Sequence, residues 1–150
     1  MASNNLITYA LIMLIAGLGI PVMAALNGGL GVRLQNPALA TTILFVVSSL
    51  ISMVYLFISG NWPKSISSNV PIYLYSGAAF VLFYILSITS IAPKFGIGNA
   101  ISFVLLGQLI SMALIDHYQL IGMPHNPVNA SRFAGLVLMV VGVFLAVRRG

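Results

Sequence analysis

The chain has 150 residues, of which 60% are hydrophobic and only 5% are charged, and its mean hydropathy is +1.10. A soluble domain carries about 25% charged residues, so this composition argues against a water-exposed surface and predicts a surface in contact with lipid. The net charge of +5 comes from Lys and Arg scattered at the edges of apolar blocks, which is typical of membrane loops and not of a nucleic-acid-binding patch.

Five apolar blocks approach or exceed the length of about 20 residues that a membrane-spanning helix needs. The first covers about residues 6–30, and we expect it to remain a span because no basic segment typical of a cleaved leader precedes it. Small residues recur four apart in this block, at Gly17, Pro21, Ala25 and Gly29, and predict a face that a neighbouring helix can approach closely. Pro21 removes one backbone donor, which predicts a kink or a break.

The second block, residues 37–59, has well-marked ends. Asn36 is suited to cap the helix, Pro37 suits its first turn, and Gly60 suits its stop. The third block covers about residues 71–91.

The four residues from Pro93 to Gly96 are too few to cross a membrane. They predict a turn that joins the third block to the fourth, residues 97–118, as an antiparallel hairpin. The fifth block, about residues 127–147, reaches an adequate length only if Asn126 caps it and Pro127 starts it. The alternative is four spans and a helix that lies on the membrane surface.

The predicted fold is an all-α integral membrane protein, a single transmembrane domain of residues 1–150 with five spans. A buried bundle in a soluble protein does not fit, because surface helices of soluble proteins have a polar face and these blocks are apolar all round. No cysteine is present, so disulfides and thiolate metal sites are excluded.

Five spans place the two termini on opposite sides of the membrane, with two basic residues on the N-terminal side against four on the other. The two are Lys64 and Arg132, and the four are Arg33, Lys94, Arg148 and Arg149. The positive-inside rule favours a cytoplasmic C-terminus. A difference of only two also allows insertion in both orientations, which predicts an antiparallel homodimer of ten helices, as in inverted-repeat transporters.

Asp116 is the only acidic residue and lies near the end of the fourth block. An ionisable group in a membrane segment is a functional candidate, here for binding substrate or coupling to protons. The alternative is structural: a carboxylate at a helix C-terminus needs a cation, and Arg132 on the same side of the membrane could supply it as an ion pair.

Gln108 lies eight residues before Asp116, near the expected bilayer midplane, with Ser111 on the same face. An amide in hydrocarbon needs a partner. It is interpreted either as a ligand that faces the substrate or as an interhelical hydrogen bond.

Asn27, followed by two glycines, indicates either a broken helix that lines a cavity or an ordinary helix end. Tyr84 lies deeper in its span than the tyrosines of an interfacial belt and remains a candidate contact for a substrate. His117 and His125 have only Asp116 near them, so neither a metal site nor a cofactor is predicted. No catalytic set and no phosphate loop is present, so we expect no enzyme.

Two stretches carry a family resemblance. The more specific stretch comprises Gly107-Gln108-Leu109-Ile110-Ser111, Ile115-Asp116-His117-Tyr118, Gly122, Arg132, Gly135 and Gly142. The other comprises Pro21, Asn27, Leu30, Pro37 and Ala40, with the turn from Pro93 to Gly96. Both resemble the YdcZ-type branch of the drug/metabolite transporter superfamily. The resemblance implies five-helix proteins of bacterial inner membranes that export small molecules as antiparallel pairs, either homodimers, paralogous partners or fused halves.

The predicted function is therefore a small secondary transporter that exports small organic metabolites or drugs by alternating access as a dimer in the lipid bilayer. Gln108, Asp116, Asn27, Ser111 and Tyr84 are the candidate residues for substrate binding or coupling. The alternative is a membrane scaffold or partner subunit that transports nothing itself.

Overall fold

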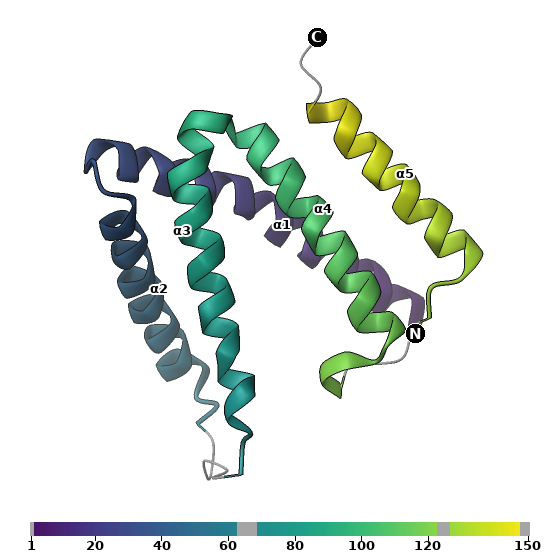
Figure 1. Cartoon of the computed structure of the whole chain (residues 1–150). Coiled ribbons are helices and arrows are strands. Elements are labelled where there is room, and N and C mark those ends of the chain that lie inside the picture. The colour runs from purple at the N-terminus through teal and green to yellow at the C-terminus, as the bar shows by residue number, and fades with distance from the viewer. Residues whose placement is uncertain (1, 63–68, 123–126, 148–150) are drawn as a thin grey trace. The chain divides into compact units, whose positions relative to one another are not determined.

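A computed structural model describes residues 2–62, 69–122 and 127–147, and these parts of the chain form helices and no strand, as predicted (Figure 1). The five α-helices are α1 (Ala2–Arg33), α2 (Pro37–Ser59), α3 (Gly77–Phe95), α4 (Ile97–His117) and α5 (Ala130–Val147). Two short 3₁₀ helices also occur, η1 (Ile72–Ser76) before α3 and η2 (Leu120–Gly122) after α4.

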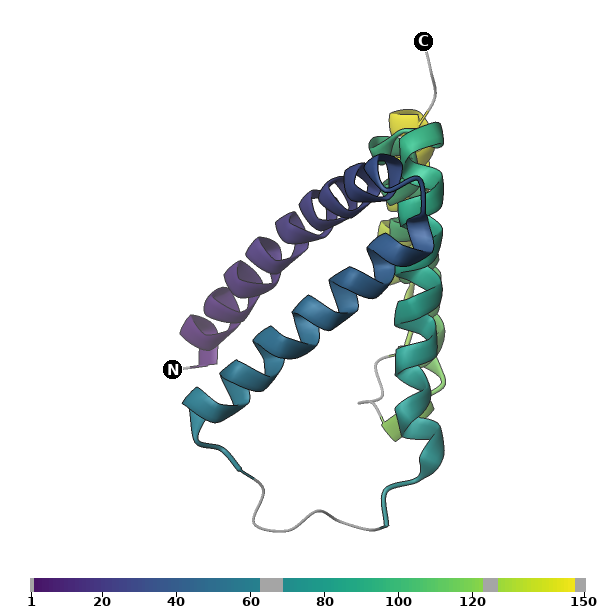
Figure 2. The same ribbon diagram turned by 90° about the vertical axis from the view of Figure 1, so that its left-hand side faces the viewer.

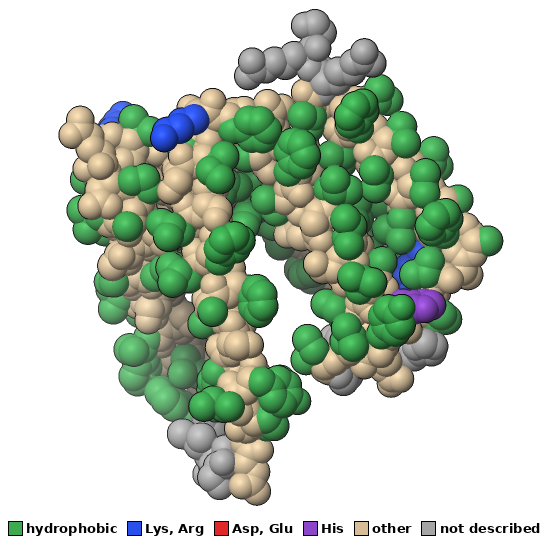
Figure 3. Space-filling view, in the orientation of Figure 1, with side chains coloured by type: hydrophobic (Ala, Val, Ile, Leu, Met, Phe, Trp, Pro, Cys, Tyr) green, Lys and Arg blue, Asp and Glu red, His purple; other side chains and the backbone are tan. Residues whose placement is uncertain are grey.

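Each of the five helices is long and apolar enough to cross a membrane, and the shortest of them, α5, has 18 residues. At 1.5 Å per residue this helix is about 27 Å long, close to a hydrocarbon core of about 30 Å. Hydrophobic side chains remain exposed along the helices, as the space-filling view shows (Figure 3), and α5 buries none of its residues. Such surfaces suit contact with lipid tails.

The contacts within the chain group it into two compact units, unit 1 (Met1–Lys94) and unit 2 (Phe95–Gly150). Unit 1 contains α1, α2 and α3, and unit 2 contains α4 and α5. The single transmembrane domain expected from the sequence stays a prediction.

The ends of α2 are those predicted from the sequence. The side chain of Asn36 accepts a hydrogen bond from the backbone N–H of Leu39 at 3.0 Å, and Pro37 occupies the first turn. Gly60 ends the helix with a φ of 63°, a left-handed conformation that glycine adopts without a Cβ clash. Local capping chemistry therefore sets both boundaries of this helix.

The core of unit 1 lies where its three helices meet, at the end marked by Arg33 and Lys94. Figure 2 shows α1 and α2 diverging from α3 with distance from this junction. Among the residues of unit 1 that the structure describes, the basic side chains lie at this end of the unit (Figure 3). The core side chains are Ala24, Asn27, Ala40, Thr41, Ile85, Ile88, Thr89 and Ala92, all less than 9% exposed.

Helix α1 continues through Pro21 and through the sequence Asn27-Gly28-Gly29 to its end at Arg33. Of the kink or break predicted at Pro21, the break was therefore wrong and the kink stays a prediction. Both interpretations of Asn27, as a helix break or as a helix end, were also wrong. A proline inside a helix removes one backbone hydrogen bond and crowds the preceding turn, at a cost of about 3 kcal/mol, and a transmembrane helix tolerates it where neighbouring groups satisfy the freed carbonyl. The amide of Asn27 bonds across to another helix instead of capping its own, and helix–helix packing then outweighs the low helix propensity of the glycines.

The connection between α3 and α4 is shorter than predicted. Pro93 and Lys94 belong to the last turn of α3, which ends at Phe95, and Gly96 alone separates it from α4. Gly96 has a φ of 90°, which L-amino acids with a side chain rarely adopt. The glycine, and not the proline, therefore ends the third span.

Helix α5 begins at Ala130, so the prediction that Pro127 starts it was wrong, while Asn126 lies outside the described residues. The cap is Asn129. Its side chain accepts from the N–H of Arg132 at 2.8 Å, and its carbonyl accepts from the N–H of Phe133 at 2.8 Å. A side-chain cap of this type fixes where the first turn starts.

Candidate functional site

The α4–α5 pair of unit 2 carries the only carboxylate in the sequence. Arg132 near the start of α5 donates through Nη2 to Oδ2 of Asp116 near the end of α4, and the structure thus brings these two residues together as an ion pair. The side chains are 23% and 26% exposed for Arg132 and Asp116 respectively. Asp116 and Arg132 are sixteen residues apart in the sequence, and the ion pair joins α4 to α5.

Each member of this pair sits at the helix end where the macrodipole disfavours its charge. Asp116 lies in the last turn of α4, where backbone carbonyls carry partial negative charge, and Arg132 lies in the first turn of α5, where N–H groups carry partial positive charge. Pairing compensates both unfavourable placements at once. The geometry accounts for a structural role of Asp116 and leaves the carboxylate partly accessible for a second role.

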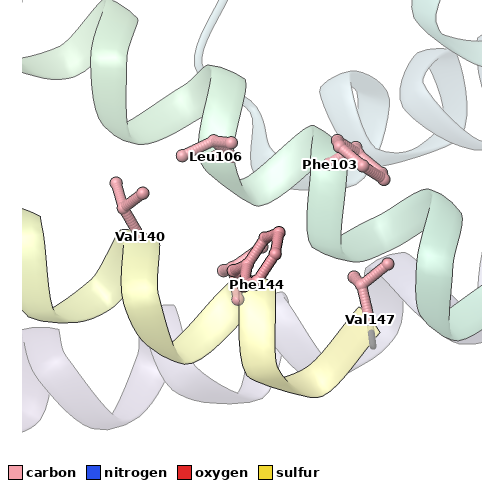
Figure 4. A pocket seen from close by; sticks show the side chains of 6 residues that line it. Phe103, Leu106, Val140, Phe144 and Val147 are labelled. Atoms are coloured by element: carbon pink, nitrogen blue, oxygen red, sulfur yellow. The ribbon is translucent and has the colours of Figure 1, made fainter. Parts of the chain in front are cut away.

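Two apolar grooves follow the α4–α5 seam away from the ion pair. One, of about 370 Å³, begins next to the pair, with Leu114 on α4 and Phe133 on α5 among its lining residues. The other, of about 230 Å³, is shown in Figure 4 and is lined by Phe103, Leu106, Val140, Val143, Phe144 and Val147. Side chains of this kind can hold a hydrophobic group or an acyl chain.

His117 is next to the ion pair in sequence and has a partner of its own. Its Nδ1 accepts from the backbone N–H of Val128 at 3.3 Å, and its ring packs edge-on against Tyr118 with 4.8 Å between the ring centroids. Within the described ranges no group of three or more metal-ligating side chains occurs, and His125 lies outside those ranges. His117 thus links the end of α4 to Val128, which lies just before α5.

In unit 1, Asn27 is placed in the helix junction. It is 4% exposed, and its Nδ2 donates to Oγ1 of Thr89 on α3 at 2.6 Å. It also borders a groove of about 280 Å³ between α1 and α2, whose other lining residues are Met23, Leu26, Leu30, Ile43, Leu44 and Val47. The amide thus ties α1 to α3 and is the one polar side chain that lines this groove.

Close backbone packing surrounds this hydrogen bond. A Cβ added at Gly31 would lie 3.0 Å from Cγ2 of Thr89 and 3.4 Å from Cα of Pro37, and a Cβ at Gly28 would lie 3.4 Å from Cγ of Pro93. Gly29 instead faces open space. The inner face of α1 therefore uses its small residues within unit 1, while the outer face does not.

Tyr84 on α3 is partly buried, and its hydroxyl is buried without a hydrogen-bond partner among the residues that the structure describes. The hydroxyl of Thr41 on α2 is also buried and also lacks a hydrogen-bond partner among these residues. Such groups are costly unless a partner satisfies them. Sequence reasoning missed Thr41 and Thr89, although a hydroxyl residue within an apolar block is a signal that could have marked both.

Gln108 and Ser111 lie on α4, and both side chains are exposed. The residues from α4 that line the two α4–α5 grooves do not include either of them. The structure thus brings Asp116 to Arg132 and Asn27 to Thr89, and it leaves Gln108 on a separate face of α4.

Of three comparisons with known proteins, the one with protein families gave a match. The comparisons with curated proteins and with solved structures found no match. A family model described as "Putative inner membrane exporter, YdcZ" matches residues 8–145, which covers all five apolar helices. This is the family that the sequence motifs resembled, and a membrane exporter is not a class of enzyme. The chain is a multi-pass membrane protein and belongs to the YdcZ family of inner membrane exporters within the drug/metabolite transporters.

Proposed function

We propose that this protein is a secondary transporter of a bacterial inner membrane that exports small organic compounds, metabolites or drugs, by alternating access. The observation that carries the proposal is the match of residues 8–145 to an inner membrane exporter family. The five apolar helices of the described chain provide the spans that such an exporter needs.

We propose further that the working unit is a pair of oppositely oriented copies. The grooves described above are open and almost entirely apolar, whereas a cavity for a small organic compound needs a few placed polar groups. A second copy would cover exposed helix faces and add its own polar side chains. The small difference in basic residues between the two sides supports insertion in both orientations.

In this proposal Gln108 and Ser111 on α4 lie between the two copies, beside the path of the substrate, because they are polar, exposed and placed within a span. Tyr84 offers a buried hydroxyl that lacks a partner among the described residues. Asp116 is the one carboxylate through which a proton or a cationic substrate could couple, in exchange for its contact with Arg132. Asn27 holds the helix junction of unit 1.

The purified protein in liposomes tests the transport proposal. We expect saturable flux of a small organic solute and counterflow, in which an internal solute drives uptake of labelled solute against its gradient. A screen that covers cations, anions and neutral compounds identifies the substrate class. Flux without counterflow would identify a channel, and complete absence of flux from folded protein would favour a scaffold that needs another subunit.

Orientation is measured separately. The chain has no cysteine, so a single cysteine can be added at either terminus and labelled from one side of intact cells. A dual-topology protein gives partial labelling at both termini. Full labelling of one terminus and none of the other would refute insertion in both orientations, while leaving transport by a pair with another protein open to the flux assay.

A further inference from the structure

Gln108 places an amide at the middle of a membrane span. Helix α4 has 21 residues, a length of about 31 Å that matches a hydrocarbon core of about 30 Å. Gln108 is the twelfth residue of this helix, next to its midpoint. Its side chain is exposed, and within the described ranges it has no hydrogen-bond partner. Lipid tails cannot satisfy an amide, so this position calls for a polar partner.

The partner does not come from α5. Leu106 and Phe103 line the groove against α5 (Figure 4), and Gln108 lies about 160° around the helix from Leu106 at 100° per residue. At 100° per residue, Ser111 lies about 60° around the helix from Gln108 on this opposite side, and Gly107 lies about 100° from it, at the edge of the face. A Cβ added at Gly107 would meet nothing within 4 Å, so a second backbone can approach closely there.

We propose that Gln108 pairs with Gln108 of a second, oppositely oriented copy of this chain, on the two-fold axis at the middle of the membrane. The proposal rests on the antiparallel dimer of the proposed function. A carboxamide carries both a donor and an acceptor, so two of them form a reciprocal pair of hydrogen bonds. The amide of Gln108 in the second copy can therefore satisfy the amide of Gln108 in the first.

The depth of Gln108 in the membrane allows it to meet the same residue of an antiparallel copy. When two copies are related by an axis in the membrane plane, a residue above the midplane faces a residue equally far below it in the other copy. Only a residue near the midplane can meet its own copy, and Gln108 is at that depth. Ile101 and Ile115 lie seven residues before and after it, about two turns away on the same face. Ile101 of one copy should therefore face Ile115 of the other.

Disulfide cross-linking in native membranes tests this register, because the chain has no cysteine of its own. We expect Gln108→Cys to form a covalent dimer on mild oxidation. Ile101→Cys alone and Ile115→Cys alone should remain monomeric, whereas their co-expression should give a mixed dimer. Leu106→Cys, which faces α5 at a similar depth, is the matched control and should not cross-link.

Two further variants distinguish the contribution of the amide hydrogen bonds from that of close helix packing on the same face. Gln108→Leu should raise the dissociation constant of the dimer in detergent roughly 3- to 30-fold, the effect of one or two interhelical hydrogen bonds in a membrane. Gly107→Leu, at the edge of this face, should weaken the dimer while the protomer unfolds at its usual temperature, because a Cβ at this position meets nothing within 4 Å in the chain. A dimer that tolerates both variants would overturn the proposal.

The outcomes distinguish this proposal from the proposed function. If all three cysteines on this face cross-link to themselves, the copies are parallel, and both the pairing and the antiparallel dimer are wrong. If terminal labelling shows both orientations and the protein is dimeric, but Gln108→Cys does not cross-link, only the pairing is wrong and another face forms the interface. Cross-linking at the expected positions without solute flux would support the pairing and contradict transport.

Discussion

Asp116 and Arg132 allow one prediction to be worked out in detail, through Asp116→Asn, Arg132→Gln and the double variant. Each charged side chain is about one quarter exposed, so the pair lies between a surface ion pair, worth about 0–1 kcal/mol, and a buried pair, whose disruption costs about 3–5 kcal/mol. We expect each single substitution to lower the free energy of unfolding by about 1–3 kcal/mol.

The two single variants should differ in size. Each single variant leaves the remaining charge at the unfavourable end of a helix dipole, which adds about 0.3–1 kcal/mol to either cost. Asp116→Asn keeps an oxygen that can accept from the guanidinium, so we expect the smaller effect from it. The double variant removes both unfavourable dipole terms and should recover most of the stability. The expected coupling energy between the two sites is about 1–2 kcal/mol.

Unfolding of the four proteins in mixed micelles, followed by far-UV circular dichroism, measures this cycle. Four coincident transitions would refute the structural role of the pair, and so would purely additive effects. Solute flux in liposomes is the second readout. If Asp116 couples transport, Asp116→Asn abolishes flux in folded protein and the second substitution does not restore it; if the pair is only structural, flux follows stability in all four proteins.

Three further predictions concern the helix junctions and the start of α5. Gly31→Ala should cost about 1–3 kcal/mol of stability, because its Cβ would lie 3.0 Å from Cγ2 of Thr89, whereas Gly29→Ala faces open space; equal melting temperatures of these two variants would contradict the packing. Thr89→Val should cost about 1–3 kcal/mol in the same unfolding assay, since the buried amide of Asn27 loses its acceptor, and an unchanged midpoint would mean that the amide finds another one. Asn129→Ala removes the cap of α5 and should cost about 0.5–2 kcal/mol, seen as lost helical ellipticity and earlier unfolding; full retention of both would exclude Asn129 as the cap.

Sequence reasoning worked best where a short-range rule decides the outcome. The bounds of α2 follow from Asn36, Pro37 and Gly60, and capping is a matter of a few neighbouring residues. The five spans follow from apolar length alone, because a bilayer imposes one thickness on every helix. The family followed from motifs along the chain, and the match over residues 8–145 confirms it.

The same rules failed where two local signals competed. Pro127 and Asn126 looked like the start of α5, yet Asn129 caps it three residues later. Pro93 looked like the end of the third span, yet the helix continues to Phe95. Sequence propensity ranks such candidates only weakly, since each difference is about 1 kcal/mol and tertiary packing exceeds it.

The amino-acid sequence by itself determined that this chain lies in a membrane as apolar helices, because composition and block length decide the solvent that a surface can face. Only the tertiary structure decided which partners the polar side chains of the described residues contact. Asn27 serves a helix junction because Thr89, 62 residues away, lies within hydrogen-bond distance, and Gln108 faces away from α5 because helix packing turned that face outward. Partners so distant in sequence meet only when the helices pack, and the free energy of packing is a sum over many contacts that no local pattern contains.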